Sequence, residues 1–268
     1  MSCTVEILSV GNELLLGNTV NTNASWIAAQ VTSLGGQVCR ITAVADNLEE
    51  ISKAIREAIR RKPNFIITTG GIGPTFDDMT LKAVARALRV RLKLDKIAVT
   101  MIREHYARRF PKRRISLTRP RLKMASIPSG SMPITNPVGT APAVRISVHG
   151  TEIFCLPGVP REAKAIFRDS LSKAISAKAG GTKFLEKWIT VQGLMESRLA
   201  PIIDNVMRKF PGVYIKSHPR GGEGRGRPFI ELHFSISSSG PGMKIERQLL
   251  GALRRLIVAV SNVGARVS

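Results

Sequence analysis

The sequence is poor in acidic residues for its size. Its 268 residues include 41 Lys and Arg but only 19 Asp and Glu, which gives a formal net charge of +22 at pH 7. A surplus of this kind favours contact with anions such as phosphate ligands, nucleic acid or acidic lipid, although a basic surface can also serve solubility alone. Charge therefore narrows the class of partner and decides nothing about reaction chemistry.

Cysteine and long apolar runs are also scarce. The three cysteines, Cys3, Cys39 and Cys155, are scattered and form no C-x-x-C pair, which argues against a disulfide framework or a zinc knuckle. The longest apolar stretches, such as residues 256–260, are too short to span a bilayer, and no basic segment typical of a signal peptide opens the chain. We therefore expect a cytoplasmic protein without a membrane partner.

The first half of the chain alternates between strand and helix patterns. Strands are predicted at Val5–Val10, Val38–Val44 and Phe65–Thr69, with a helix at Asn23–Ser33 and a second helix between the last two strands. The run 65–69 is apolar and β-branched throughout, which is typical of a strand buried on both faces. This order predicts an α/β domain with three layers and a mainly parallel sheet, whose ligands bind at the carboxyl ends of the strands.

The remainder divides into two parts. Residues 112–123 are predicted to be a basic loop, and strands are predicted at 122–127, 143–148 and 153–156. After a linker at 177–181, the pattern changes to β-α-β-β-α, which predicts a small separate α+β domain. The expected domains are therefore residues 1–176 and 183–262.

A glycine-rich loop follows the strand at 65–69. Gly70, Gly71 and Gly73 precede a helix, and only glycines let backbone N–H groups approach phosphate oxygens closely. Thr75 can add a hydroxyl donor. The segment Thr68–Asp78 is thus predicted to bind a phosphate-bearing ligand.

Two adjacent carboxylates, Asp77 and Asp78, end this loop. Beside a phosphate site they would repel the ligand unless a hard cation such as Mg²⁺ lay between them. The alternative is that Asp77 is only a helix N-cap and Asp78 a partner of the helix dipole. Spacing alone does not decide between the two.

Other segments are expected at the same sheet edge. Glu13 follows the first strand, beside Gly11 and Asn12, and it could share a metal with Asp78 or act as a general base. A solvated surface glutamate is the alternative. The segments 136–142 and 156–162 either close over the ligand or are simply rigid turns.

Five motifs together resemble the CinA family (competence/damage-inducible protein A). They are SVGNELLLG at 9–17, NTN at 21–23, TGGIGPTFDDMT at 69–80, NPVGTAP at 136–142 and LPGVPRE at 156–162. The likeness covers residues 4 to about 175 and implies a molybdopterin-binding-like domain of the molybdenum-cofactor (MoCF) biosynthesis superfamily. Residues 183–260 resemble the KH-type domain that follows it. Because the chain ends at Ser268, the resemblance implies no C-terminal deamidase domain.

The resemblance also implies a function and a site. In CinA proteins this domain is associated with metal-dependent hydrolysis of a pyrophosphate such as ADP-ribose, and relatives are usually homodimers. Mg²⁺, Mn²⁺ or Co²⁺ is the expected cofactor. Glu13 and Asp78 would be catalytic, and Asp77, Asp78 and Glu13 would bind the metal. The residues expected around the substrate are Gly11, Asn12, Gly70, Gly71, Gly73, Thr75, Asn136, Gly139, Thr140, Pro157 and Gly158.

Three hypotheses follow, in order of preference. The first is a metal-dependent pyrophosphatase acting on ADP-ribose or a similar nucleoside diphosphate. The second is a module that binds molybdopterin, or its nucleotide, without hydrolysis. The third is a nucleic-acid binder, which rests on the net charge of +22 and the small domain.

Overall fold

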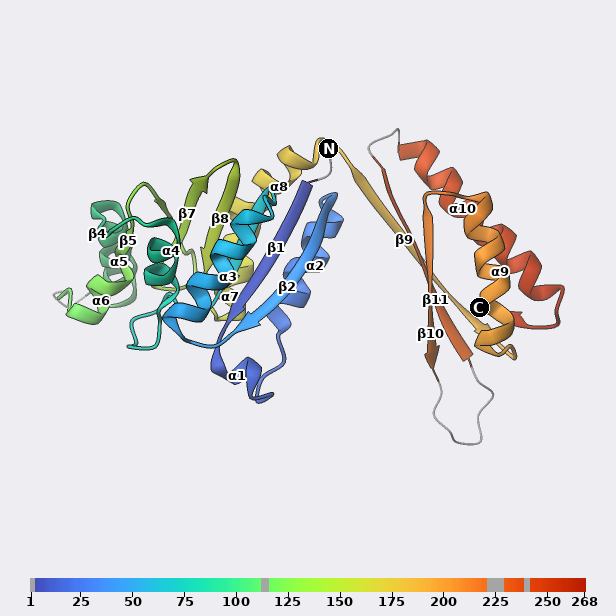
Figure 1. Ribbon diagram of the computed structural model, residues 1–268, viewed down its shortest axis with the longest axis horizontal. Coiled ribbons are helices and arrows are strands. Elements are labelled where there is room, and N and C mark those ends of the chain that lie inside the picture. The colour runs from blue at the N-terminus through green and yellow to red at the C-terminus, as the bar shows by residue number, and fades with distance from the viewer. Residues whose placement is uncertain (1–2, 112–115, 221–228, 239–241) are drawn as a thin grey trace. The chain divides into compact units, whose positions relative to one another are not determined.

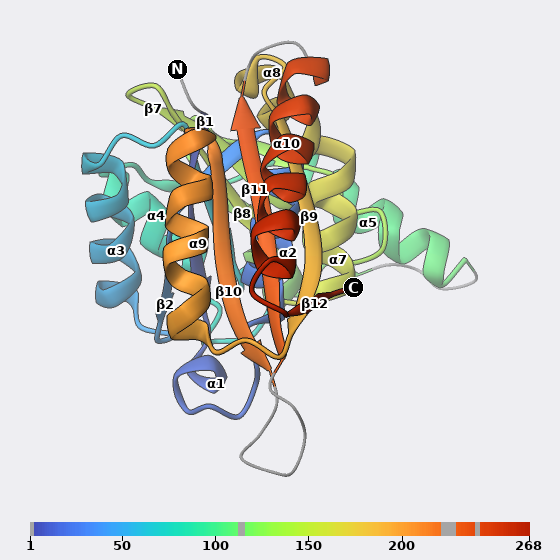
Figure 2. The same cartoon turned by 90° about the vertical axis from the view of Figure 1, so that its right-hand side faces the viewer.

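The computed structural model describes residues 3–111, 116–220, 229–238 and 242–268. They form two compact units, one of residues 1–32 and 36–179 and the other of residues 33–35 and 180–268. Figures 1 and 2 show the strands and helices of each unit. Each unit has its own hydrophobic core.

The first unit contains a six-stranded sheet in the order β2-β1-β3-β8-β7-β6. Strands β2, β1, β3 and β8 are parallel, and β7 is antiparallel to its two neighbours. The predicted α/β fold with a mainly parallel sheet is confirmed. The strands are β1 (Cys3–Val10), β2 (Gly36–Val44), β3 (Phe65–Thr69), β6 (Met132–Ile134), β7 (Ala143–Val148) and β8 (Thr151–Leu156).

Helices cover both faces of this sheet. Figures 1 and 2 show α3 (Leu48–Arg60) and α4 (Thr80–Leu88) on one face and α2 (Thr22–Ser33) and α7 (Pro160–Ile166) on the other. Alternate residues of each strand pack under the helices on opposite faces of the sheet, because successive side chains of a strand point to opposite faces. The core on the α3 and α4 side contains Leu8, Val10, Ile66, Ile153 and Cys155.

The remaining elements of this unit are short or lie at its margins. They are α1 (Asn12–Leu15), β4 (Leu92–Leu94), α5 (Lys96–Arg109), α6 (Arg119–Met124), β5 (Ser126–Pro128), a π-helical turn (Phe167–Leu171) and α8 (Ser172–Ala179). The predicted strand at 122–127 was wrong over its first half, where α6 ends. Pro120 lies in the first turn of α6, where the missing N–H costs nothing. Residues 112–115 of the predicted basic loop lie outside the described residues.

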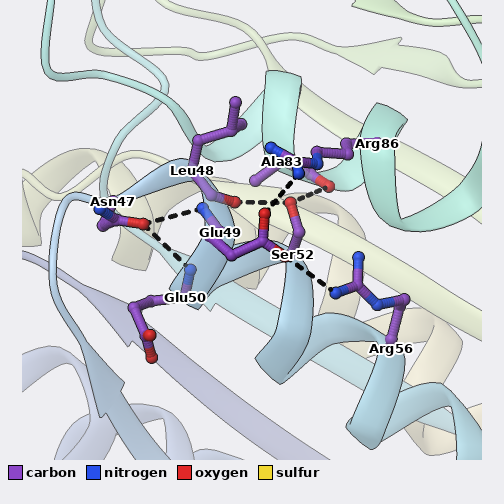
Figure 3. A network of polar contacts seen from close by, with 8 residues as sticks. All are labelled: Asn47, Leu48, Glu49, Glu50, Ser52, Arg56, Ala83 and Arg86. Carbon is purple, nitrogen blue, oxygen red and sulfur yellow. Dashed lines mark hydrogen bonds and ion pairs between the residues drawn. The ribbon is translucent and has the colours of Figure 1, made fainter.

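A polar network joins α3 to α4 (Figure 3). The Asn47 side chain caps α3 by accepting from the backbone N–H of Glu49 at 2.8 Å and of Glu50 at 3.2 Å. Within the helix, the buried Ser52 hydroxyl reaches the carbonyl of Leu48 at 2.6 Å and that of Ala83 in α4 at 3.2 Å. The Glu49 carboxylate pairs with Arg56 and with Arg86 of α4. The two helices are therefore held together close to the strand ends that precede them.

The second unit has the predicted β-α-β-β-α order, followed by a short edge strand. Its antiparallel sheet, in the order β10-β11-β9-β12, packs one face against α9 and α10. The elements are β9 (Lys183–Gln192), α9 (Glu196–Lys209), β10 (Val213–Arg220), β11 (Phe229–Ser238), α10 (Gly242–Ser261) and β12 (Arg266–Val267). Across the residues that can be described, none of the helices has both the length and the apolar character needed to span a bilayer.

An ion pair with a buried carboxylate anchors β1 to the end of α3. The Arg61 guanidinium donates to both carboxylate oxygens of Glu6 at 2.7 Å, and the Glu6 side chain is only 7% exposed. The hydrogen bonds to Glu6 raise the pKa of Arg61. Removing the cation would leave a buried carboxylate without its charge partner, which is costly.

We expect Arg61→Met to lower the free energy of unfolding by about 2 kcal/mol, less than for a fully buried pair because Arg61 is partly exposed. Chemical denaturation of the purified protein measures this. Arg56→Met is the matched control, since its pair with Glu49 is exposed and should contribute under about 0.5 kcal/mol. Equal losses in the two variants would contradict the structural role of the Glu6 pair.

The three cysteines should differ in reactivity. Burial raises the pKa of the Cys155 thiol to about 11, against a small lowering by Thr68, and burial also raises the pKa of Cys3. Cys39 is exposed. Because the thiolate is the nucleophile, we expect iodoacetamide at neutral pH to label Cys39 alone in the folded protein and all three in denaturant. Mass spectrometry of labelled peptides would show this, and rapid labelling of Cys155 before unfolding would be inconsistent with it.

Candidate functional site

Four parallel strands end at one edge of the sheet. In the strand register Val10 pairs with Val44, Ser9 with Thr69, and Thr69 with Leu156. The segments that follow these strands therefore start side by side, as Figure 1 shows for α1 below β1 and β2. This edge is where ligands bind in parallel α/β sheets.

A cavity of about 520 Å³ lies over these strand ends. Most of the predicted site residues line it. They are Gly11, Glu13, Gly70, Gly71, Gly73, Thr75, Asp77, Asp78, Thr140, Pro157 and Gly158. Asn12, Asn136 and Gly139 instead lie behind it, where they fix neighbouring segments through hydrogen bonds.

The glycines of the loop are required by close packing inside the protein. Gly70 has a φ of +98°, and a Cβ there would collide with the carbonyl oxygen of Val10. Its own carbonyl accepts from the buried Thr80 hydroxyl at 2.8 Å, and its N–H donates to Leu156 at 3.0 Å. Only glycine adopts such a backbone without strain. The loop is thus fixed to both neighbouring strands before any ligand arrives.

Asp78 holds the far side of the loop in place. Its Oδ2 accepts from the Thr75 backbone N–H at 2.8 Å and from the Thr75 hydroxyl at 2.6 Å. A Cβ on Gly73 would lie 2.7 Å from this same oxygen, so glycine is needed for the turn to close. The alternative role as a dipole partner does not describe this geometry, because the carboxylate turns back onto the loop.

Asp77 is exposed and lines the cavity. The alternative that it caps the following helix is wrong, since α4 begins at Thr80 and Met79 occupies the N-cap position. The neighbouring Thr75 hydroxyl lowers the pKa of Asp77, with smaller contributions from its own backbone N–H and from Lys123. Asp77 is therefore an ionised carboxylate at neutral pH that is not needed to build the helix.

The segment after β1 is tied to the segment after β2. The Asn12 backbone N–H donates to Asp46 Oδ2 at 2.8 Å, and the Asp46 N–H donates back to the Asn12 side-chain oxygen at 3.2 Å. This reciprocal pair places Glu13 at the rim of the cavity, with its carboxylate folded back over Gly11. Asn12 is therefore a positioning residue for the two acidic side chains.

Asn136 is a positioning residue for the segment on the opposite side of the cavity. Its buried amide donates to Glu162 Oε2 at 2.7 Å and to the Ala141 carbonyl at 3.0 Å. The amide oxygen accepts from the Gly139 N–H at 2.8 Å. The segment 136–142 is thereby closed on itself, which brings Thr140 and Glu162 to the cavity wall.

The cavity is acidic although the protein is strongly basic. Five carboxylates line it, and no Lys or Arg of the described chain does. They belong to Glu13, Asp46, Asp77, Asp78 and Glu162. A phosphate cannot approach so many like charges without a cation, so the donor set suits a hard divalent ion with oxygen ligands.

The protein alone does not assemble a complete metal cage here. Within the ranges that the structure describes, there is no group of three or more His, Cys, Asp or Glu side chains close enough to hold one ion. Mg²⁺ commonly binds to one or two carboxylates and completes its shell with water and substrate phosphates. The exposed carboxylates of Glu13 and Asp77, which both line the cavity, are of the kind that such a site uses.

Three lining residues with polar side chains are absent from the predicted site. Asp46 follows β2 directly, so the rule that ligands bind at strand ends could have identified it. Glu162 stands in the segment 156–162, which was expected at this sheet edge, but no role was predicted for its carboxylate. Tyr106 lies in the last turn of α5 and carries no local signal, because the fold alone brings that helix to the cavity.

Comparison with known proteins places this geometry in a family. Residues 6–177 match the family described as "Probable molybdopterin binding domain". Proteins of Sulfurisphaera tokodaii and Pyrobaculum calidifontis are each 42% identical to this chain, over 94% and 97% of it and 92% and 96% of their own lengths. The KH-type resemblance of the second unit lies outside the family match and stays a prediction.

A solved structure extends the comparison to three dimensions. The crystal structure of the protein CinA, of unknown function, from Thermoplasma acidophilum is 41% identical, covers 65% of this chain and 98% of its own, and has a TM-score of 0.60. Together with the matched residues 6–177, it shows that this chain belongs to the family of probable molybdopterin-binding domains that includes CinA.

Proposed function

We propose that the cavity binds the pyrophosphate of a nucleotide or pterin ligand together with a divalent cation, and that the protein hydrolyses this pyrophosphate. The acidic lining of a glycine-loop cavity in a protein of net charge +22 carries the proposal. Such a lining repels a bare phosphate and accepts one whose charge is neutralised by a metal.

Glu13 and Asp77 are the residues best suited to hold that cation, and Asp78 could contribute its second oxygen. The first two are exposed, and Asp78 has one oxygen committed to Thr75. When bound, Mg²⁺, Mn²⁺ or Co²⁺ would supply Lewis-acid stabilisation of the phosphate charge.

In this proposal Glu13 accepts a proton from the attacking water. The water oxygen forms a new bond to one phosphorus, and the bridging P–O bond breaks with its electron pair passing to the leaving phosphate. ADP-ribose and water would thereby give AMP and ribose 5-phosphate. The Thr75–Asp78 hydrogen bonds keep the loop rigid while charge shifts, so the site needs little reorganisation.

The enzyme hypothesis is tested with ADP-ribose and Mg²⁺, Mn²⁺ or Co²⁺, with AMP measured by chromatography. We expect Glu13→Gln to lower kcat roughly 100-fold, the usual contribution of a general base. Asp77→Asn should raise the metal concentration needed for half activity at least roughly tenfold, which even a supporting residue of a metal site can cause.

Asp204→Asn is the matched control, because Asp204 is an exposed carboxylate on α9 of the second unit. Asp204→Asn should leave both kcat and the metal concentration needed for half activity unchanged. Absence of AMP with every metal, or full activity in Glu13→Gln and Asp77→Asn, would refute hydrolysis at this site.

A second candidate function is binding of molybdopterin, or of its nucleotide, without hydrolysis. The commitment of Asp78 Oδ2 to Thr75 favours it, since that oxygen is engaged in holding the loop. Pterin released from the denatured protein and detected by fluorescence should then be present at close to one equivalent. Protein purified without pterin and unable to take it up would exclude this function.

The nucleic-acid partner and the homodimer stay predictions. The basic residues of α5 and α6 include Arg121, whose guanidinium lies 3.9 Å from the Tyr106 ring centroid. One face of the Tyr106 ring is therefore already covered by a cation. Binding to DNA or RNA that weakens as salt is raised would support the nucleic-acid partner. Light scattering would measure the mass in solution and so test the homodimer.

A further inference from the structure

A second cavity lies against the other side of the glycine loop. Its volume is about 450 Å³, and Gly71, Ile72, Gly73 and Asp78 line both cavities. The loop is thus the wall between them. α4, α6 and β4 supply most of the remaining surface of the second cavity.

The two cavities carry opposite charge. Lys82, Arg119 and Lys123 line the second, with Asp78 as the acidic residue that it shares with the first. The Lys123 ammonium also donates a hydrogen bond to the Thr75 carbonyl, so this cation is fixed to the loop itself. An anionic group would be attracted to this side of the loop without any metal.

The rest of the lining is apolar. Leu81 and Ile72 are buried, and Leu92 and Leu122 extend the same surface. Phe76, at the rim, is 89% exposed although it is a large apolar side chain. A ring held in water in this way contributes almost nothing to the core, so the fold gives no reason for an aromatic residue at this position.

A ligand that carries both an aromatic ring and a phosphate is bound by cations beside an apolar wall and an exposed aromatic side chain. The ring stacks on the aromatic side chain, and the phosphate pairs with the cations. Neither feature alone would select this class of ligand, because cations alone accept any anion and an apolar wall accepts any ring.

We propose that the second cavity binds the nucleoside monophosphate half of the ligand, with the base stacked on Phe76 and its phosphate paired with Lys82, Arg119 and Lys123. This rests on the proposed function in one respect, namely that the pyrophosphate continues past the loop into the acidic cavity. The glycine loop would then lie between the two halves of the ligand. The protein would bind the nucleoside monophosphate half directly and the other half through a cation.

The proposal is tested by calorimetric titration with AMP and with ribose 5-phosphate, both without divalent metal. Phe76→Ala should weaken AMP binding roughly tenfold, the effect of losing one stacked base, and leave ribose 5-phosphate unchanged. Lys82→Ala should weaken both ligands about tenfold, because both lose a charge-assisted hydrogen bond. Both side chains are exposed, so the fold should survive either change.

Two matched controls separate this site from general surface effects. Val258→Ala removes an exposed apolar side chain on α10, and Lys53→Ala removes an exposed cation on α3. Neither should change the affinity for AMP. Unchanged AMP affinity in both Phe76→Ala and Lys82→Ala would overturn the proposal, as would equal weakening of AMP and ribose 5-phosphate by Phe76→Ala.

The outcome is distinguishable from failure of the proposed function. If the wild-type protein binds AMP through Phe76 yet never hydrolyses ADP-ribose, the second cavity is confirmed and the enzyme hypothesis falls. If it hydrolyses ADP-ribose with an unchanged KM in Phe76→Ala, the hydrolysis stands and the second cavity is excluded as the site for the base.

Discussion

The parallel pairing of β1, β2, β3 and β8 is the constraint on which the rest of this protein depends. Parallel strands that follow one another in the chain need helical crossovers, and they all deliver their carboxyl ends to one edge of the sheet. Each strand end must therefore turn into its following segment within the same small area. Crowding at this edge explains why Gly70 has no room for a Cβ against Val10, and why Asn12 and Asp46 bond to each other across neighbouring turns.

The same crowding concentrates carboxylates in a basic molecule. Glu13, Asp46, Asp77, Asp78 and Glu162 come from four separate segments, and their mutual repulsion opposes this arrangement. Some of them are held by neutral donors: Asp46 by Asn12, Asp78 by Thr75 and Glu162 by Asn136. These hydrogen bonds stabilise the charge without neutralising it, so the cavity remains able to attract a cation. On the far side of the loop, Lys82, Arg119 and Lys123 reverse the sign of the field.

Much of the fold could be predicted because its signals are local. The apolar run 65–69 is a strand with the predicted bounds, and the β-α-β-β-α order of the second unit is confirmed. Local signals failed where two patterns overlapped. Residues 119–124 read as a loop running into a strand, yet they form α6, since Pro120 starts a helix readily and the charged residues around it are also good helix formers.

By itself the sequence determined the strand ends, the glycine loop, and the carboxylates Glu13, Asp77 and Asp78 that follow them, because each depends on neighbours in the chain. It could not determine what those residues touch. Gly73 was expected to make room for phosphate, but the tertiary structure shows that it makes room for Asp78. Tyr106 reaches the cavity from a helix that has no motif, and Phe76 is left in water at the rim of a second, cationic cavity. Such contacts join residues distant in the chain, so only the packing of helices against the sheet decides them.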